Sequence, residues 1–598
     1  MLKSKRNKIA RMKKGTIKQQ IMDFFHEHSR AAFNYRQVAA ALGITRQTGK
    51  EMVDELLHDL LEQHFLQSER EGRYQLAQIM RKDRKVMGDD IMSEFELPES
   101  YPEEAEKAAL AFSEEIHPEE YSYREDFRQV PTFTIDPQEA KDFDDALSIR
   151  ALPNGNWEIG VHIADVTFYV KPDSVIDREA EKRATSVYLV DRTIPMLPER
   201  LCNQVCSLRP DEEKRCFSCI FELDAQAEVK ASRIRRTVIK SNCRLSYDQA
   251  QDIIDGKSEL MKDEMLQLNA LAKILRERRF KNGSIRFESQ EVCFRTDENG
   301  KPLSVYFKES GESHNLIEEF MLLANRTVAE YVGKQSNPKP FVYRVHDLPD
   351  MEKLADVSKF IKSFGHHLDI EGGQKQLSRN INKMLDEIKG TAEENMISSI
   401  TIRAMAKAVY STENIGHYGL AFSHYTHFTS PIRRYPDMMV HRLLERYLNG
   451  GKAFDRERLE RRCEHCSAME QLAAQAERAS IKSKQVEFMA DQLGHVFKGH
   501  VSGVSEFGMF VEIDENKCEG LVAMRDLEDD HYDFDEKNYR LVGRHHKKVY
   551  RLGDTVYVLV ARANMDRRQL DFVLTDNEED IKEADSRPSQ GPATAGQV

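Results

Sequence analysis

The sequence TIDPQEAKDFDDALSI, residues 134–149, places the four aspartates Asp136, Asp142, Asp144 and Asp145 within ten positions. The β-branched and aromatic residues at 132–135 favour a strand immediately before them. Because the Asp-Pro step at 136–137 disfavours helix, Asp136 is predicted where this strand turns into a loop. If residues 142–145 stay extended, Asp142 and Asp144 share one face and Asp145 takes the other.

Carboxylates gathered in this way repel one another, by roughly 4 kcal/mol for a pair ~4 Å apart at an effective dielectric constant of about 20. A divalent cation removes that cost, and ligands that are all oxygen select magnesium, manganese or calcium. Two-metal phosphoryl chemistry is the leading hypothesis, because it needs carboxylates on neighbouring segments to hold two cations across one phosphate.

Three other readings of the cluster stay open: a solvated acidic loop, an EF-hand calcium loop and an aspartyl-phosphate loop. The calcium loop fits poorly, because the turn glycine is missing and no Glu lies twelve residues after Asp142. An aspartyl-phosphate loop would not need the long polar stretch that follows the predicted strand.

The string Asp136-Pro-x-x-Ala-x-Asp142-Phe-Asp144-Asp145-Ala146 resembles the catalytic signature of the ribonuclease II/ribonuclease R exoribonucleases, the RNB family. Further matches follow in order: HIADVTFYV (162–170), RATSVYLVDRTIPMLPERLCNQVCSL (183–208), LIEEFMLLAN (316–325) and HFTSPIRRYPDMMVHRLL (427–444). They extend from about residue 95 to residue 490, and the resemblance is strongest to the ribonuclease R group.

The resemblance implies a magnesium-dependent, processive 3′→5′ exoribonuclease that releases nucleoside 5′-monophosphates. It implies a monomer that acts on single-stranded RNA or on RNA with a 3′ overhang, with one or two Mg²⁺ ions. The four aspartates would hold metal and position the attacking water. Tyr188 would stack on a base near the 3′ end, although a buried structural tyrosine is the alternative. Tyr247, with Glu318 or Glu319, would grip the terminal nucleotides.

Two arginines precede a predicted helix in TSPIRRYPDMMVHRLL. Pro436 suits a first helical residue, so the helix is expected to begin near Asp437. Arg433 and Arg434 then lie at its N-terminus, where free N–H groups and the helix dipole favour an anion. Arg433 is the candidate for the scissile phosphate, because a guanidinium can contact two phosphate oxygens. Arg434 is assigned to substrate binding, and a surface arginine pair bonded to acids is the alternative for both.

The expected fold class is multidomain α+β, with six segments. These are a basic leader (1–15), a winged helix (16–78), an acidic linker (79–130), a mixed α/β catalytic domain (131–490), an OB-fold barrel (496–574) and a disordered tail (575–598). Within the catalytic domain, 157–170 is expected to form strand, turn and strand, and 315–334 a helix.

The winged-helix prediction rests on helices at 17–26 and 35–42 and on a third helix with a stripe of Val53, Leu56, Leu57, Leu60 and Leu61. Thr45 or Thr48 would cap that third helix, and a hairpin at 65–76 would form the wing. Contact with nucleic acid and contact with protein are equally consistent with this unit.

Relatives in the family carry two cold-shock barrels between the winged helix and the catalytic domain. Only about fifty residues intervene here, without alternating strands, so both barrels are expected to be absent. At the other end, 496–574 resembles the five-stranded OB-fold barrel common in RNA nucleases. Phe497, Phe507, Phe510 and His531 match its base-stacking positions, although aromatics on such strands can also be core.

Composition limits the classes of function that the chain can have. The 598 residues carry a net charge of −13, so basic surfaces must be local, and no apolar run approaches the ~20 residues of a membrane span. Nine cysteines, an odd number, indicate a reducing compartment, and we expect a cytoplasmic protein. Zinc at Cys202, Cys206, Cys216 and Cys219, or at Cys463 and Cys466, is a weaker alternative. His424, His427 and His441 are interpreted as packing or hydrogen-bonding residues.

Two rival functions stay open. One is a non-catalytic RNA-binding regulator on the same fold, which would be marked by loss of an aspartate or of Arg433, and none is lost. The other is a winged-helix DNA-binding protein with an accessory nuclease, which a C-terminal RNA-type barrel disfavours.

Overall fold

The structure is a computed structural model. It describes residues 17–18, 21–22, 24–25, 33–42, 44, 47–62, 65–70, 73–76 and 87–575, apart from 288–290, 299, 309, 363, 392, 528 and 536–539. The basic leader predicted at 1–15 lies outside the described residues, as do 576–598 of the tail and the linker residues 79–86. Among the described helices, none is long and apolar enough to cross a membrane.

The N-terminal unit contains two of the three predicted helices and the predicted hairpin, whereas most of the helix predicted at 17–26 lies outside the described residues. Helix α2 (Tyr35–Ala41) and helix α3 (Gln47–Glu62) precede the antiparallel pair β1 (Leu66–Arg70) and β2 (Arg73–Leu76). The apolar stripe of α3 lies in a small core of its own with Phe25 and Tyr74. Helix α3 begins at Gln47, so Thr48 lies within its first turn, and Thr45 lies outside the described residues. The assignment of this unit as a winged helix stays a prediction.

The described part of the acidic linker contains two helices and a 3-10 turn, followed by the short strand β3 (Glu125–Asp126). It forms α5 (Met87–Glu94), α6 (Glu103–Leu110) and the 3-10 turn η2 (Pro118–Ser122), and residues 87–124 contain no strand. Ile91 and Met92 of α5 pack in a cluster with Val187, Leu189 and Ala476. A helix is therefore packed against the catalytic domain along the stretch where two barrels would stand in the family pattern.

A seven-stranded sheet forms the centre of the catalytic domain, in the order β11-β4-β5-β6-β9-β10-β3. Its strands are β3 (Glu125–Asp126), β4 (Thr132–Asp136), β5 (Asp145–Ala151), β6 (Trp157–Ala164), β9 (Glu213–Leu223), β10 (Val229–Lys240) and β11 (Cys243–Ser246). Neighbouring strands are antiparallel except at the two edges, where β11 pairs with β4 and β3 pairs with β10 in parallel. Strand β4 is the strand predicted before the aspartate cluster.

The prediction of two strands in 157–170 is half wrong. Strand β6 forms as expected, but α7 (Val166–Tyr169) is a short helix. A short apolar run does not distinguish a strand from a buried helical turn by its periodicity. The tertiary structure decides it here, because the preceding Asp165 is buried between Arg124 (2.8 Å) and Arg236 (2.7 Å).

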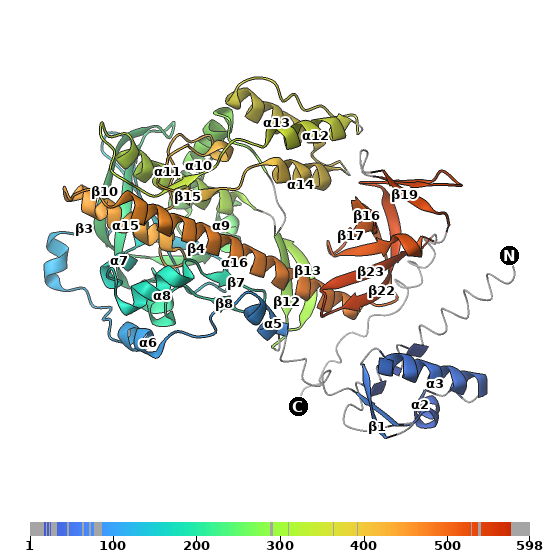
Figure 1. Ribbon diagram of the computed structural model, residues 1–598. Helices are drawn as coiled ribbons and strands as arrows, with labels where there is room; N and C mark the ends of the chain where they lie inside the picture. The colour runs from blue at the N-terminus through green and yellow to red at the C-terminus, as the bar shows by residue number, and fades with distance from the viewer. Residues whose placement is uncertain are drawn as a thin grey trace.

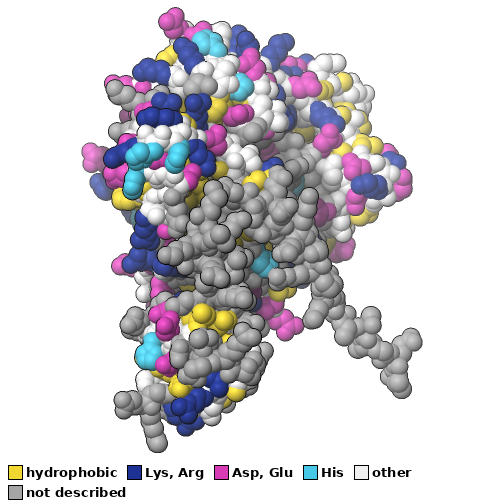
Figure 2. Space-filling model, turned by 90° about the vertical axis from the view of Figure 1, so that its right-hand side faces the viewer, with side chains coloured by type: hydrophobic (Ala, Val, Ile, Leu, Met, Phe, Trp, Pro, Cys, Tyr) yellow, Lys and Arg dark blue, Asp and Glu magenta, His cyan; other side chains and the backbone are white. Residues whose placement is uncertain are grey.

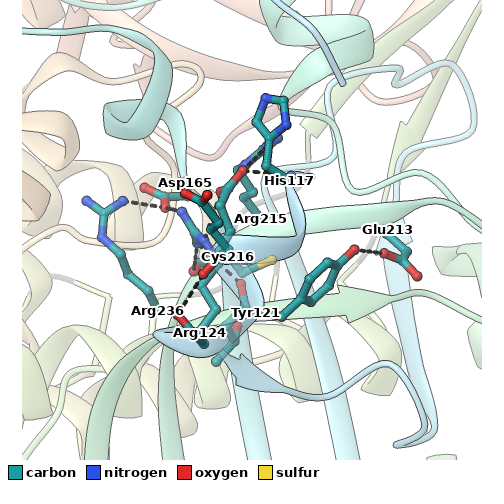
Figure 3. Close-up of polar contacts among 12 residues, drawn as sticks. His117, Tyr121, Arg124, Asp165, Glu213, Arg215, Cys216 and Arg236 are labelled. Carbon is teal, nitrogen blue, oxygen red and sulfur yellow. Dashed lines mark hydrogen bonds and ion pairs between the residues drawn. The ribbon is translucent and has the colours of Figure 1, made fainter. Parts of the chain in front are cut away.

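Figure 3 shows that buried ion pair and a second one beside it. Arg215 bonds to the carboxylate of Glu120, which lies in η2. Burial works against the charged form of Asp165, but Arg236 and Arg124 hold its pKa below the ordinary value. Buried ion pairs are costly to break on one side only, so these contacts keep the segment before β4 in place on the sheet.

The rest of the catalytic domain is mainly helical. In chain order its helical elements are α8 (Val175–Arg183), the π-turn η3 (Leu201–Val205), α9 (Tyr247–Ile254), α10 (Lys262–Lys281), α11 (Glu312–Gly333), α12 (Met351–Lys362), α13 (Gln374–Ile388), α14 (Glu394–Ala404), the 3-10 turn η4 (Tyr418–Leu420), α15 (Tyr435–Leu448) and α16 (Arg456–Ala490). Helix α11 confirms the helix predicted at 315–334. Short strand pairs also form: β7 (Val187–Tyr188) with β8 (Thr193–Ile194), β12 (Glu291–Thr296) with β13 (Pro302–Lys308), and β14 (Tyr343–Val345) with β15 (Val409–Ser411).

The C-terminal unit is the predicted five-stranded closed barrel. It consists of β16 (Val496–Ser505), β17 (Gly508–Ile513), β18 (Glu519–Ala523), β22 (Thr555–Asn564) and β23 (Gln569–Leu574). The 3-10 turn η5 (Met524–Asp526) and a three-stranded sheet, β19 (Tyr532–Asp535), β20 (Arg540–Gly543) and β21 (Val549–Arg551), are inserted after β18. Gly508 has a φ of +144°, and a Cβ there would lie 2.1 Å from the Val522 oxygen.

Helix α16 joins the catalytic domain to the barrel. Figure 1 shows it passing along the catalytic domain and ending at the barrel. Its residues Val486 and Met489 share one apolar cluster with barrel residues such as Val511 and Phe572 and with helices α12–α14. On the side of the molecule shown in Figure 2, basic and acidic side chains are interspersed, so overall charge does not indicate where RNA would bind.

Candidate active site

The aspartate cluster lies where β4 ends and β5 begins. Asp136 is the last residue of β4, as predicted, and is paired with Ser246 of β11. Asp145 is the first residue of β5 and is paired with Ile163. The loop between them is held by Ser207, whose Oγ accepts from the Phe143 N–H (3.1 Å) and donates to the Lys141 oxygen (2.7 Å). The cluster is therefore built on two neighbouring strands with an anchored loop.

Asp144 connects this loop to the arginine segment far along the chain. Its Oδ1 accepts a hydrogen bond from the Ile432 N–H at 2.9 Å, and its Oδ2 lies 3.6 Å from Arg433 Nε. Its backbone oxygen accepts from the Ala164 N–H at 2.9 Å. The aspartate cluster and the segment that contains Arg433 are thus in contact through the carboxylate of Asp144.

Burial and mutual repulsion disfavour the charged form of these carboxylates. Burial, with the charge of Asp145, raises the pKa of Asp136 to about 8. Burial raises the pKa of Asp145 to about 6 against the opposing charges of Arg433 and Arg434. Burial likewise raises the pKa of Asp142 and, well above its ordinary value, that of Asp144, again opposed by Arg433.

The residues fit a bound divalent cation. Oδ2 of Asp136 and Oδ2 of Asp144 are buried and have no hydrogen-bond partner in the structure. A buried polar atom without a partner costs about 1–3 kcal/mol, and a hard cation would supply the missing ligand contact. Among the described residues, no three Asp, Glu, His or Cys side chains converge on one point, so a cation here would keep part of its water shell.

Arg433 and Arg434 differ in what they contact. Arg434 precedes α15, and its guanidinium donates to both oxygens of Asp437, at 2.9 and 2.8 Å. The Arg433 side chain is 43% exposed and donates to Ser430 Oγ at 3.1 Å. Arg433 therefore keeps free donors facing the aspartates, whereas a substrate contact by Arg434 stays a prediction that the pairing with Asp437 does not favour. Helix α15 begins at Tyr435, two residues before the predicted start, with Pro436 in its first turn.

Tyr188 lies at the end of β7 and is 41% exposed. Its backbone N–H donates to Glu477 of α16 at 2.9 Å. Burial of the hydroxyl raises its pKa; the charge of Arg433 opposes that shift, and the charges of Asp142 and Asp144 add to it. The charges of Asp142 and Asp144 thus act on the phenol hydroxyl, while the residue as a whole stays partly exposed.

Tyr247 follows Ser246, the partner of Asp136, and opens α9. Its ring stacks on the His314 ring with centroids 3.8 Å apart and planes 7° apart, and Lys308 Nζ lies 5.3 Å from its centroid. Burial, then the charges of Asp145 and Asp136, raise the pKa of its hydroxyl. Tyr247 therefore follows directly on the strand that pairs with Asp136, and its hydroxyl is subject to the charges of two of the aspartates.

The two glutamates of LIEEFM differ in exposure. The Glu319 side chain is 3% exposed and ion-paired to Arg279 at 2.5 Å. The Glu318 side chain is 50% exposed, with Arg279 at 3.2 Å. Glu318 is thus the glutamate open to a substrate. Its neighbour His314, four residues earlier on α11, was missed from sequence, although the i, i+4 spacing before Glu318 could have indicated a shared face.

The barrel aromatics differ in exposure. Phe507 is 70% exposed in the β16–β17 turn. Phe497 is partly buried against the apolar cluster and Phe510 is half-buried, so each shows less of its ring. His531 is exposed, with its ring centroid 6.3 Å from that of His545. Base stacking at these four residues stays a prediction, for which Phe507 is the strongest candidate.

The cysteines and the histidines near the site are accounted for by packing. Each cysteine considered for zinc is a buried free thiol, and burial raises the pKa of Cys202 and Cys463. His427 Nδ1 lies 2.8 Å from the Tyr410 hydroxyl, and His441 Nε2 lies 2.7 Å from the Phe428 oxygen.

Comparison with known proteins agrees with this geometry. The RNB domain family matches residues 124–450, and the S1 RNA binding domain family matches residues 490–574. Ribonuclease R of Aquifex aeolicus is 40% identical over 503 residues, which cover 82% of this chain and 71% of that protein.

Solved structures show the same fold. Mycoplasma genitalium RNase R in complex with ribose methylated single-stranded RNA aligns with a TM-score of 0.77 and 28% identity, over 83% of this chain and 78% of that one. Yeast Ssd1, described as a pseudonuclease, shares the fold alone, with a TM-score of 0.59 and 23% identity over 71% of this chain and 53% of that one. The chain therefore belongs to the RNB family, and like its ribonuclease R relatives it is a 3′→5′ exoribonuclease, a hydrolase.

Proposed function

We propose that this exoribonuclease is magnesium-dependent and processive, and that it releases nucleoside 5′-monophosphates from single-stranded RNA or from RNA with a 3′ overhang. The observation that carries the proposal is the meeting of Asp144 with Ile432 and Arg433, which joins the carboxylates to the phosphate-binding side chain. A reducing cytoplasmic setting is consistent with nine free cysteines.

Asp136 and Asp144 would hold the cation, with Asp142 and Asp145 completing the acidic site. Mg²⁺ supplies Lewis-acid chemistry when bound: it makes a water more acidic and offsets charge on the leaving oxygen. The Oδ2 atoms of Asp136 and Asp144, which are buried without a hydrogen-bond partner, are the candidate ligand atoms. Asp145 and Asp142 also orient the attacking water toward the phosphorus.

Arg433 would bind the scissile phosphate and stabilise the charge that develops on it. The Ser430 hydroxyl fixes its guanidinium, and the Ser186 N–H bonds to its backbone oxygen at 3.0 Å. The water oxygen bonds to phosphorus while the bond to the 3′-oxygen of the preceding nucleotide breaks. The proton that the water gives up balances the one that the leaving 3′-oxygen takes up, and the released nucleotide keeps the 5′-phosphate. A preorganised charge of this kind contributes more than the same contact in water.

Tyr188 and Tyr247 would place the terminal nucleotides. Tyr188, which is partly exposed, suits stacking on a base, and Tyr247 with Glu318 suits contacts to the terminal ribose. His314 stacks on the Tyr247 ring and Lys308 Nζ lies over it, so they act as positioning residues.

An end-labelled RNA assay tests this proposal. A 5′-labelled single-stranded RNA should shorten progressively from its 3′ end in magnesium, and chelation by EDTA should stop the reaction. Cleavage of a circular RNA at the same rate would indicate an endonuclease and contradict the proposal. Equal cleavage of DNA would favour the DNA-directed alternative, and binding without cleavage would favour the regulator.

A further inference from the structure

Helices α10 and α13 face each other across a hollow of about 900 Å³ that the proposed reaction does not use. Its lining residues are Lys273, Arg276, Glu277, Phe280 and Lys281 on α10, Arg379, Asn382, Lys383, Asp386 and Glu387 on α13, and Arg286. Both helices contribute residues at i, i+3, i+4, i+7 and i+8, the spacing of a single helix face. Figure 1 shows α10 and α13 as neighbours beside α11. We call this feature the α10–α13 groove.

The separation of the two walls is fixed by hydrogen bonds at the end of α10. Asn382 Oδ1 accepts from the Arg286 N–H at 2.9 Å, and Asn382 Nδ2 donates to the Ser284 oxygen at 2.8 Å. One side chain of α13 thus bonds to the segment that follows α10. The relative position of the two helices that form the groove is therefore stabilised by specific hydrogen bonds.

The groove carries an excess of positive charge. Six Lys or Arg side chains line it against three Asp or Glu side chains. The acids near the end of α13 are paired, Asp386 with Arg286 at 3.2 Å and Glu387 with Lys383 at 3.7 Å. Arg276, Lys281 and Arg379 have no hydrogen bond or ion pair with any residue that the structure describes.

An aromatic ring holds the arginines in place. The guanidinium groups of Arg276, Arg279 and Arg286 lie 4.9, 4.7 and 4.5 Å from the centroid of Phe280. Nε of Arg276 and Nε of Arg286 are buried without a partner. Arg279 is ion-paired to Glu319 and Arg286 to Asp386, so Arg276 is the guanidinium at this ring that a bound anion would neutralise.

We propose that the α10–α13 groove binds the phosphate backbone of RNA outside the catalytic channel. The proposal rests on the exoribonuclease function proposed above and adds a second contact surface for the same substrate. Lys273 and Lys281 are about 12 Å apart along the helix axis at 1.5 Å per residue, a span longer than one phosphate and suited to a row of them. A smaller hollow shares Lys273 and Arg276 and reaches Asn315 on α11, the helix that carries Glu318.

Salt-dependent binding tests the proposal. The triple variant Arg276→Gln, Lys281→Gln, Arg379→Gln is made in an Asp144→Asn background, so that RNA is bound and not degraded. Single strands contribute about 0.7 to the slope of log K against log salt for each neutralised phosphate, so the slope for a long RNA of about 30 nucleotides should become shallower by about 2. Its Kd at low salt should rise at least about tenfold. The Kd of an RNA of about five nucleotides, which fills only the channel, should stay unchanged.

A matched triple variant controls for general loss of charge. Arg235→Gln, Lys240→Gln and Arg461→Gln remove three exposed bases that lie outside the groove, and should leave the slope unchanged. Equal slopes for the groove variant and this control would overturn the proposal. The proposal would also be overturned if the groove variant lost affinity for inorganic phosphate or AMP but not for long RNA, since the groove would then bind a small anion. If the unmodified chain shortens no RNA at all, the proposed function fails while the binding result stands.

Discussion

The backbone N–H of Ile432 donates a hydrogen bond of 2.9 Å to Oδ1 of Asp144, across 288 positions of the sequence. This single contact brings the acidic loop beside the arginine that precedes α15. Because it leaves Oδ2 of Asp144 without a hydrogen-bond partner, one oxygen of the carboxylate holds the fold together and the other stays available.

Replacing Asp144 by Asn tests this division of roles. The amide oxygen can still accept from Ile432, so the fold should be kept, while the negatively charged ligand atom is lost. We expect cleavage of labelled RNA to be abolished and RNA affinity to stay within about threefold, since phosphate and base contacts carry binding. Asp191→Asn, at an aspartate outside the cluster, is the control. Substantial turnover by Asp144→Asn would place the metal site elsewhere.

Tyr188→Ala should change the length of the final resistant oligonucleotide. Base–aromatic stacking contributes roughly 1–3 kcal/mol, enough to retain or release a short end product. Tyr188→Phe keeps the ring and should give the same product ladder as the unmodified chain, resolved on a denaturing gel. If the alanine variant also leaves the ladder unchanged, Tyr188 is a structural tyrosine.

His314→Ala should lower kcat on short RNA by about tenfold or more with little change in KM, because Tyr247 loses the ring that orients it. One misplaced group near the reacting atoms costs up to about 100-fold. His314→Phe restores a flat ring and should recover most of the rate. Similar losses for the alanine and phenylalanine variants would mean that stacking is not the role of His314.

Phe507→Ala should weaken binding of long RNA by about fivefold or more, the equivalent of about 1 kcal/mol of stacking. The ring is 70% exposed, so its removal should leave thermal stability unchanged. A point variant is preferable to deletion of the barrel, whose core is continuous with α12–α14 and α16. Phe497→Ala is the control. If it loses more RNA affinity than Phe507→Ala, base stacking occurs at Phe497 and not mainly at Phe507.

Acid should destabilise the catalytic sheet through buried neutral histidines. Burial lowers the pKa of His162 from the ordinary 6.5 to about 3, while it hydrogen-bonds to Ser148 and Ser218. Below pH ~6.5 His162 becomes protonated in the unfolded chain but stays neutral in the folded chain. The contribution of neutral His162 to the free energy of unfolding is therefore complete above that pH. It is lost at up to about 1.4 kcal/mol per pH unit as the pH falls.

Urea unfolding followed by the fluorescence of Trp157, the single tryptophan and a residue of the same strand, measures this loss. In His162→Gln the free energy of unfolding should depend less steeply on pH between about pH 6 and pH 5, by the equivalent of roughly one proton. An unaltered pH dependence in that variant would contradict a neutral buried His162.

The sequence by itself determined the strand before Asp136, the helix of LIEEFM, the helix after Arg434 and the C-terminal barrel. Each of these depends on local periodicity, on a proline or on a motif of adjacent residues, which the chain displays without its tertiary contacts. The aspartates and Arg433 were identifiable for the same reason.

Only the tertiary structure decided which member of each residue pair is available. Glu318 and Glu319 are equivalent in sequence, but only Glu319 is buried in its ion pair with Arg279. Arg434 is held by both oxygens of Asp437, whereas Arg433 stays 43% exposed beside Asp144. The helix at 166–169, the stack of His314 on Tyr247 and the groove between α10 and α13 likewise arise from contacts between distant segments. Burial and ion pairing depend on which surfaces meet, and no local pattern in the sequence contains that information.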